Sequence, residues 1–110
     1  MPQSGLNFTQ YRARFAAVSM YAGVNSGSGS NRYYSYERGL VHFVVLTAEA
    51  YLYTRTPVFL ANQLAWLKKD LAAVDRSATP WIVVQMHKDW TMAAEAFKDF
   101  QPVLDQYNVE

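Results

Sequence analysis

Apolar side chains recur at steps of three and four residues between residues 58 and 74, and charged side chains such as Lys68 and Lys69 fall outside the series. The apolar positions are Leu60, Leu64, Leu67, Leu71 and Val74. This spacing places one apolar face along an α-helix. The pattern therefore predicts an amphipathic helix that packs on a sheet.

Two nearly continuous apolar runs flank this helix. Residues 40–46 read Leu-Val-His-Phe-Val-Val-Leu, and residues 81–84 read Trp-Ile-Val-Val directly after Thr79-Pro80. Such runs are typical of strands that are covered on both faces. A strand, a helix and a second strand joined by a short return form a βαβ unit, whose crossover we expect to be right-handed.

A third β-prone run, residues 33–36, precedes the first apolar strand. Glu37-Arg38-Gly39 separates the two, and its glycine can supply the positive φ that a tight hairpin often requires. We therefore expect an antiparallel hairpin with His42 inside its second strand. For a histidine in a buried strand, a structural role is the stronger interpretation.

The N-terminal part of the chain predicts a short helix and a loop. Phe8, Tyr11 and Phe15 are spaced by three and four residues, so they would share one face of the helix. Residues 23–31 are rich in glycine, serine and asparagine, which tolerate unusual backbone angles and bury little. They predict a mobile surface loop.

Helical spacing returns near the C-terminus. Its apolar positions are Ala93, Phe97, Phe100, Leu104 and Tyr107. Pro102 lacks a backbone N–H, so it should kink this helix or divide it in two. The chain thus belongs to the α/β class, with a hairpin, a βαβ unit and a C-terminal helix.

Composition limits the classes of function. With 110 residues, 51% apolar and 17% charged, the chain is expected to form one compact domain or part of one. A net charge of +1 predicts neither a nucleic-acid nor an anionic-membrane partner, and the apolar runs are too short to span a bilayer. The absence of cysteine excludes disulfides, thiolate metal sites and cysteine nucleophiles.

Candidate chemistry rests on His87, one of two histidines. It follows the strand predicted at residues 81–84, and α/β sheets place their chemistry at the carboxyl ends of strands. The sequence has no His-x-x-x-His pair and no Gly-x-Ser-x-Gly elbow. Taken alone, a histidine in this position more often caps or hydrogen-bonds a loop than binds a ligand.

Several motifs together change that interpretation. The most specific are Gln63-x-x-Trp66-Leu67-x-x-Asp70-Leu71-x-x-Val74-Asp75-Arg76 and Thr79-Pro80-Trp81. Further matches are Phe8-x-x-Tyr11-x-x-Arg14-Phe15, Tyr33-Tyr-Ser-Tyr36, Gly39-Leu-Val-His-Phe-Val44, Thr47-x-Glu49 and His87. In these motifs the chain resembles the purple acid phosphatases, a branch of the calcineurin-like metallophosphoesterases. The resemblance extends over nearly the whole chain.

The resemblance implies that residues 1–110 form part of a metallophosphoesterase sandwich, with an incomplete sheet. It also implies a phosphate-ester substrate and a dinuclear metal centre, of iron with zinc, manganese or a second iron, that performs two-metal hydrolysis. Of the ligand motifs in that family only the fourth has a counterpart here, at His87. We therefore name His87 as a metal-ligand candidate, and no catalytic or substrate-binding residue.

The remaining ligand motifs of the family would lie outside this sequence. One imidazole cannot hold two cations, so we expect this chain alone to bind no dinuclear centre and to be inactive. Gln85-Met86 and Lys88-Asp89 depart from the family pattern around His87 and favour an alternative, a degenerate non-catalytic interaction module.

An incomplete sheet would also expose strand edges and apolar faces, so self-association is expected. The family's usual setting is secreted or vacuolar, and the sequence itself leaves the localisation undetermined.

Overall fold

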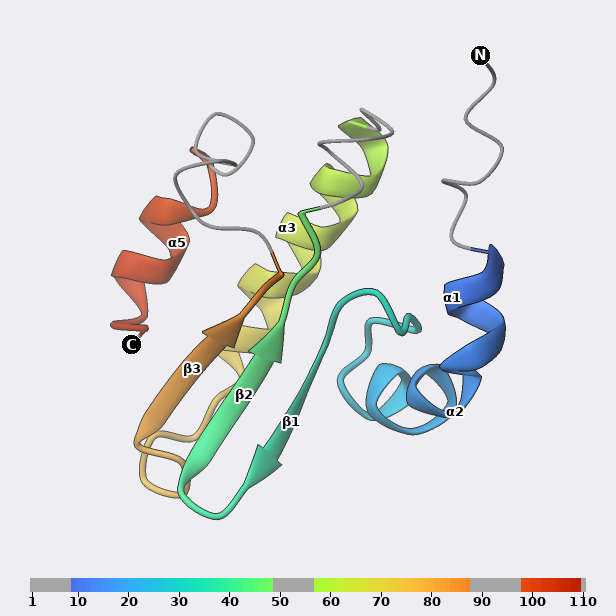
Figure 1. The fold of residues 1–110 in the computed structure, drawn as a ribbon. Helices are drawn as coiled ribbons and strands as arrows, with labels where there is room; N and C mark the ends of the chain where they lie inside the picture. The colour runs from blue at the N-terminus through green and yellow to red at the C-terminus, as the bar shows by residue number, and fades with distance from the viewer. Residues whose placement is uncertain (1–8, 49–56, 88–97, 110) are drawn as a thin grey trace.

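The computed structural model describes residues 9–48, 57–87 and 98–109. Its elements, shown in Figure 1, are α1 (Thr9–Arg14), α2 (Ala16–Val18), the π-helical segment η2 (Ser19–Gly23), β1 (Tyr34–Arg38), β2 (Val41–Val45), α3 (Pro57–Ala72), β3 (Trp81–Gln85) and α5 (Gln101–Gln106). The strands form one three-stranded sheet in the order β1-β2-β3. The predicted α/β class, with its incomplete sheet, is confirmed.

The predicted hairpin is present. β1 and β2 pair antiparallel, and the pair Arg38 and Val41 closes a turn made by Gly39 and Leu40. Gly39 has a φ of 60°, which a residue with a Cβ adopts at a cost. Glu37 and Arg38, expected in the turn, instead extend β1, because the turn needs only two residues.

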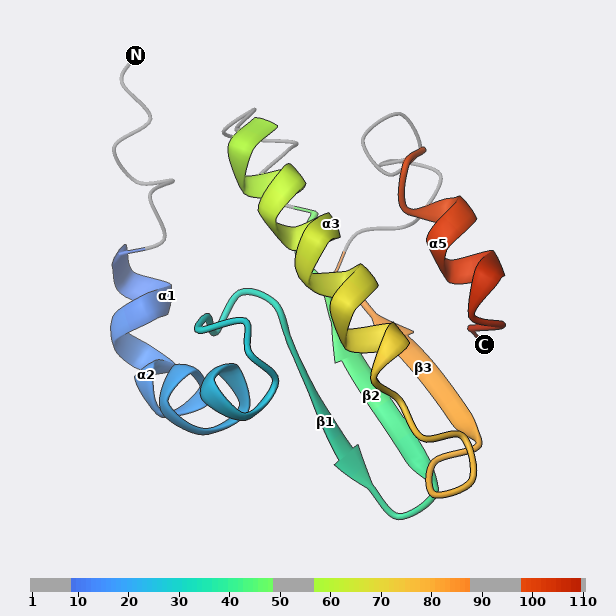
Figure 2. The ribbon, with the colours of Figure 1, turned by 180° about the vertical axis from the view of Figure 1, so that it is seen from behind.

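The βαβ unit is also confirmed. β2 and β3 run parallel, and α3 connects them across one face of the sheet (Figures 1 and 2). With α3 towards the viewer, as in Figure 2, the connection moves to the right from β2 to β3, which is the right-handed crossover. None of the described helices is long and apolar enough to cross a membrane.

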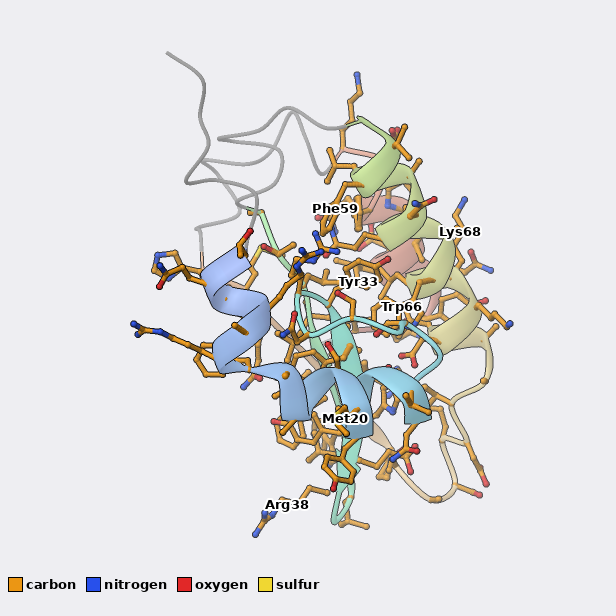
Figure 3. The ribbon with its side chains drawn as sticks, turned by 90° about the vertical axis from the view of Figure 1, so that its right-hand side faces the viewer. Met20, Tyr33, Arg38, Phe59, Trp66 and Lys68 are labelled. Atoms are coloured by element: carbon orange, nitrogen blue, oxygen red, sulfur yellow. The ribbon has the colours of Figure 1, made fainter. Side chains whose placement is uncertain are left out.

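The buried face of α3 is wider than the apolar series indicated. Leu67 and Leu71 are fully buried, as expected, whereas Leu64 is half-buried. Gln63 and Trp66, which are not part of the series, are buried as well. Tyr33 lies between Trp66 and Phe59, with ring centroids 5.3 and 5.5 Å away (Figure 3). This aromatic group joins α3 to the segment before β1.

α3 covers one face of the sheet (Figure 2), although both faces of β2 were expected to be covered. His42 and Val44 are buried on the side of α3. Phe43 lies on the opposite side, half-buried, where it stacks on Tyr36 with ring centroids 5.2 Å apart. Trp81 in β3 is 54% exposed. Among the described residues this second face is aromatic and partly open, and we name it the open face.

The short N-terminal helix is confirmed. Residues 24–29 are exposed or half-exposed, as expected of a surface loop, whereas the ends of the loop are buried. Ser30 and Asn31 are buried, and the Asn31 side-chain amide donates a 3.0 Å hydrogen bond to the Phe15 carbonyl, where α1 gives way to α2. The Trp66 indole donates a 2.8 Å hydrogen bond to the Ser26 carbonyl. Polar side chains and backbone groups thus hold the ends of this segment in place. Its composition indicated which residues tolerate unusual backbone angles, but it did not indicate which of them are buried.

Pro102 is the second residue of α5, and residues 98–100 just before this helix form a turn, so α5 begins at Gln101, directly before the proline. In the first turn the missing N–H would have no intrahelical acceptor, so proline is tolerated there. Phe100 and Val103 join the core beside α3. The Arg76 guanidinium donates hydrogen bonds to the carbonyls of Tyr107 and Asn108, which fixes the end of α5. The part of the predicted helix at residues 93–97 lies outside the described residues.

Replacing Gly23 by alanine should destabilise the fold. The added Cβ would lie 2.7 Å from the Ser30 carbonyl oxygen and 2.9 Å from the Ser30 nitrogen, both backbone atoms that cannot move independently. We expect the free energy of unfolding to fall by about 1–3 kcal/mol in urea titrations. Val24→Ala, at a neighbouring side chain that is 65% exposed, is the control and should change stability by less than about 0.5 kcal/mol. Equal stability of the two variants would contradict the close packing.

Candidate functional site

His87 lies just after β3, at the edge of the sheet where the parallel strands β2 and β3 both end. A pocket of about 490 Å³ opens there. It is lined by residues 45–47 after β2, by residues 85–87 after β3, and by Tyr11 and Arg32. The sheet therefore places His87 where the sequence predicted, at a carboxyl edge that also carries a pocket.

Strand pairing continues up to the rim of this pocket. Val45 is in register with Gln85, and the Leu46 N–H donates a 2.9 Å hydrogen bond to the Gln85 carbonyl. His87 therefore leaves the sheet directly beside the segment that follows β2. Residues that pair between β2 and β3 are 40 positions apart in sequence, so two distant chain segments meet at this site.

Gln63 of α3 fixes the β2 side of the pocket. Its side chain is fully buried, accepts a 2.9 Å hydrogen bond from the Thr47 N–H, and donates a 3.2 Å hydrogen bond to the Thr47 carbonyl. One amide therefore satisfies both backbone groups of a residue that has left the ladder. Gln63 belongs to the most specific sequence motif, but that motif did not predict this contact.

Arg32 brings positive charge to the same pocket. Its guanidinium carbon lies 4.7 Å from the centroid of the Phe59 ring, within the range of a cation–π contact. Burial, and next the neighbouring Arg12 charge, hold the pKa of Arg32 below its ordinary value, against a smaller opposing effect of Tyr33. Sequence reasoning missed Arg32, since nothing in its neighbours along the chain links it to His87.

The metal centre implied by the resemblance can be tested against the donors present. The described residues that line the pocket supply one imidazole and no carboxylate. Across the described ranges, no three His, Cys, Asp or Glu side chains come close enough to hold a metal ion. A dinuclear centre therefore does not fit the described residues by themselves, because it requires several ligands and a bridging group.

A second polar cluster lies on the opposite side of β2 from the open face, against α3. Asp70 accepts a 2.5 Å hydrogen bond from the Ser35 hydroxyl and contacts His42 Nε2 at 2.7 Å. The other ring nitrogen of His42, Nδ1, lies 3.3 Å from a Glu37 carboxylate oxygen. The side chains of His42 and Asp70 are only 8% and 7% exposed. We call these four residues the Asp70 network.

The arrangement of the Asp70 network indicates a structural role. The carboxylate stands between the hydroxyl and the imidazole, so His42 cannot act as a base on Ser35 as it would in a hydrolytic triad. Burial lowers the pKa of His42, but hydrogen bonds and charge from Asp70 and then Glu37 outweigh it and raise that pKa above its ordinary value. Two carboxylates facing both ring nitrogens favour the imidazolium, which donates from each nitrogen. This agrees with the structural role expected for His42.

Sequence reasoning missed Asp70 as the partner of His42. A signal was present, because Asp70 lies three residues after Leu67 and four before Val74 and so falls on the apolar face of the predicted helix. A carboxylate on that face requires a buried partner.

Comparison with known proteins adds a family to this geometry. No family model matches the chain. Purple acid phosphatase 23 of Arabidopsis thaliana is 47% identical over 87 residues, which cover 79% of this chain and 17% of that protein. Purple acid phosphatase 15 of the same plant is 46% identical over 83 residues, covering 76% of this chain and 14% of that protein. By sequence, the chain belongs to the purple acid phosphatases.

An acid phosphatase of Aspergillus ficuum is also similar, with 29% identity over 136 residues, 91% of this chain and 21% of that protein.

The chain spans less than a fifth of the length of these purple acid phosphatases, so it corresponds to a segment of them. Its three-stranded sheet and few helices agree with part of a metallophosphoesterase fold. The resemblance in motifs thus extends to overall sequence identity. Family membership implies a metal centre in general, while the described residues of this purple acid phosphatase segment contain no complete set of ligands for one.

The raised pKa of His42 makes stability depend on pH. A folded-state pKa above the unfolded value of about 6.5 means that the stabilisation is fully present below that pH and is lost as the pH rises through the folded-state pKa. We expect wild-type melting temperatures to fall between pH 6 and pH 9. His42→Gln should lower the free energy of unfolding at pH 6 by about 3 kcal/mol and flatten the profile.

Asp70→Asn is the second variant, because it removes the carboxylate that raises the His42 pKa. It should flatten the same profile while leaving the imidazole in place. A wild-type stability that rises from pH 6 to pH 8, or a His42→Gln profile parallel to the wild type, would contradict the assignment.

Proposed function

We propose that residues 1–110 form part of the calcineurin-like catalytic domain of a dinuclear-metal phosphomonoester hydrolase, in which His87 supplies one metal ligand. The observation that carries the proposal is the 47% identity to purple acid phosphatase 23. The position of His87 supports it, because the residue lies at the carboxyl edge of parallel strands and lines a pocket. The substrate would be a phosphate ester, and the metals iron with zinc, manganese or a second iron.

The same proposal predicts that this chain alone is inactive. The described residues offer one candidate ligand, and a dinuclear centre needs several, so the other ligands would come from the rest of a whole phosphatase. The contribution of this segment is then a scaffold. Strand pairing and the Gln63 contact fix the pocket rim, and His87 lies at that rim.

Segment replacement tests this directly. The matching segment of purple acid phosphatase 23 is exchanged for this chain, and hydrolysis of p-nitrophenyl phosphate is measured together with bound metal. We expect the chimera to keep metal-dependent activity, and its His87→Ala variant to lose about 100-fold in kcat/KM along with part of its metal, because a ligand is removed. Lys68→Ala, an exposed position on α3, is the control. The isolated chain should show no turnover above buffer.

Three results would count against the proposal. Metal-dependent turnover by the isolated chain would show that the ligand set is complete within it. A folded chimera that binds no metal and has no activity would favour the alternative of a non-catalytic interaction module, which the substitutions around His87 suggested. Retention of full activity by His87→Ala would remove that residue from the metal site.

We also propose that the isolated chain self-associates through its strand edges. Among the described residues β1 and β3 each have one paired side, and Trp81 and Tyr36 are 54% and 39% exposed. Light scattering after gel filtration should give a mass that increases with concentration. Trp81→Lys, at the start of β3, should shift the chain towards monomer, whereas Met20→Lys, at a position 66% exposed in η2, should not. A monomer at all concentrations would refute this.

A further inference from the structure

Arg32 and His87 line the same pocket, although Arg32 precedes β1 and His87 follows β3, the two outer strands of the sheet. The remaining polar groups at that pocket include the Tyr11 phenol, the Thr47 hydroxyl and the Gln85 amide, all of which can donate hydrogen bonds. The described lining contains no carboxylate. The described part of the lining thus presents a guanidinium and hydrogen-bond donors, which are the groups that bind oxyanions in proteins.

The guanidinium of Arg32 is held in a way that suits an oxyanion. Contact with the Phe59 ring limits the positions that the guanidinium can take, and Phe59 is itself packed on Tyr33 in the aromatic group shown in Figure 3. A guanidinium that is already held in place loses less conformational freedom when it binds an oxyanion. Its position is therefore pre-organised.

The electrostatic environment of Arg32 points the same way. The group is partly buried and the Arg12 charge lies nearby, and both effects disfavour its positive charge. A bound anion would offset both, since it places an opposite charge against a guanidinium in a medium of reduced dielectric constant. An anion bound at Arg32 would therefore stabilise the charged form of its guanidinium.

We propose that Arg32 is an anion-binding residue of the His87 pocket and that it holds the phosphate group of the ligand. The choice of a phosphate ester as ligand rests on the proposed function. The binding of the anion by Arg32 rests on the pocket alone and requires no metal. Arg32 would therefore act on substrate affinity, independently of the metal-ligand role proposed for His87.

Titration of the metal-free, full 110-residue chain with inorganic phosphate tests the proposal. A chelator is present, ionic strength is held constant with chloride, and binding is followed by two-dimensional NMR. We expect saturable shifts at residues 45–47 and 85–87. Arg32→Gln should weaken binding by about tenfold. Arg32→Lys keeps the positive charge but cannot form two parallel hydrogen bonds, so it should weaken binding by a smaller factor. Arg38→Gln, an exposed arginine in the hairpin, is the matched control and should bind like the wild type.

Circular dichroism of each variant separates loss of binding from loss of fold, and Arg32→Lys supplies the comparison if Arg32→Gln does not fold. The proposal is overturned if the wild type shows no saturable shifts at the pocket, if Arg32→Gln or a folded Arg32→Lys binds with unchanged affinity, or if Arg38→Gln weakens binding equally. Because no metal is present, these results are independent of whether the chimera hydrolyses p-nitrophenyl phosphate.

Discussion

A buried carboxylate governs how this segment is assembled. Asp70 of α3 contacts Ser35 in β1 and His42 in β2, so one side chain connects the helix to both strands of the hairpin. A charge at that depth is tolerated only when it is paired, and a shift of register by one residue would turn the partner on the shifted strand to the open face. Gln63 lies seven residues earlier on α3, about two turns, and reaches Thr47 at the pocket rim. The network thereby sets the position of the candidate site.

Periodicity in the sequence was sufficient for the hairpin, the βαβ unit and the placement of His87, since each depends on local spacing and on the common direction of parallel strands. Buried polar contacts were not predictable in this way. Asn31 is buried through a carbonyl 16 positions away, and Asp70 through a hydroxyl 35 positions away. Hydropathy marks these residues as surface residues, because their partners are known only when the chain is folded. Arg32 was missed for the same reason.

The proposed phosphatase role and the anion site divide the pocket between two kinds of chemistry. His87 would contribute to a metal centre completed by other parts of a longer phosphatase, whereas Arg32 provides charge from within this segment. The open face, where Phe43 and Tyr36 stack, is a second surface that distinguishes this segment from an isolated domain. In a complete domain, an aromatic face of this kind normally packs against another layer.

The two kinds of strand pairing also impose an order on folding. The Gly39 turn brings Arg38 and Val41 together across two residues, and hairpins of this kind close within about 1–10 μs. Every pair between β2 and β3 joins residues 40 positions apart, so β3 must pay a much larger loop-closure entropy before it gains a partner. During synthesis the hairpin can therefore form early, while the pocket edge that carries His87 is completed only when β3 docks.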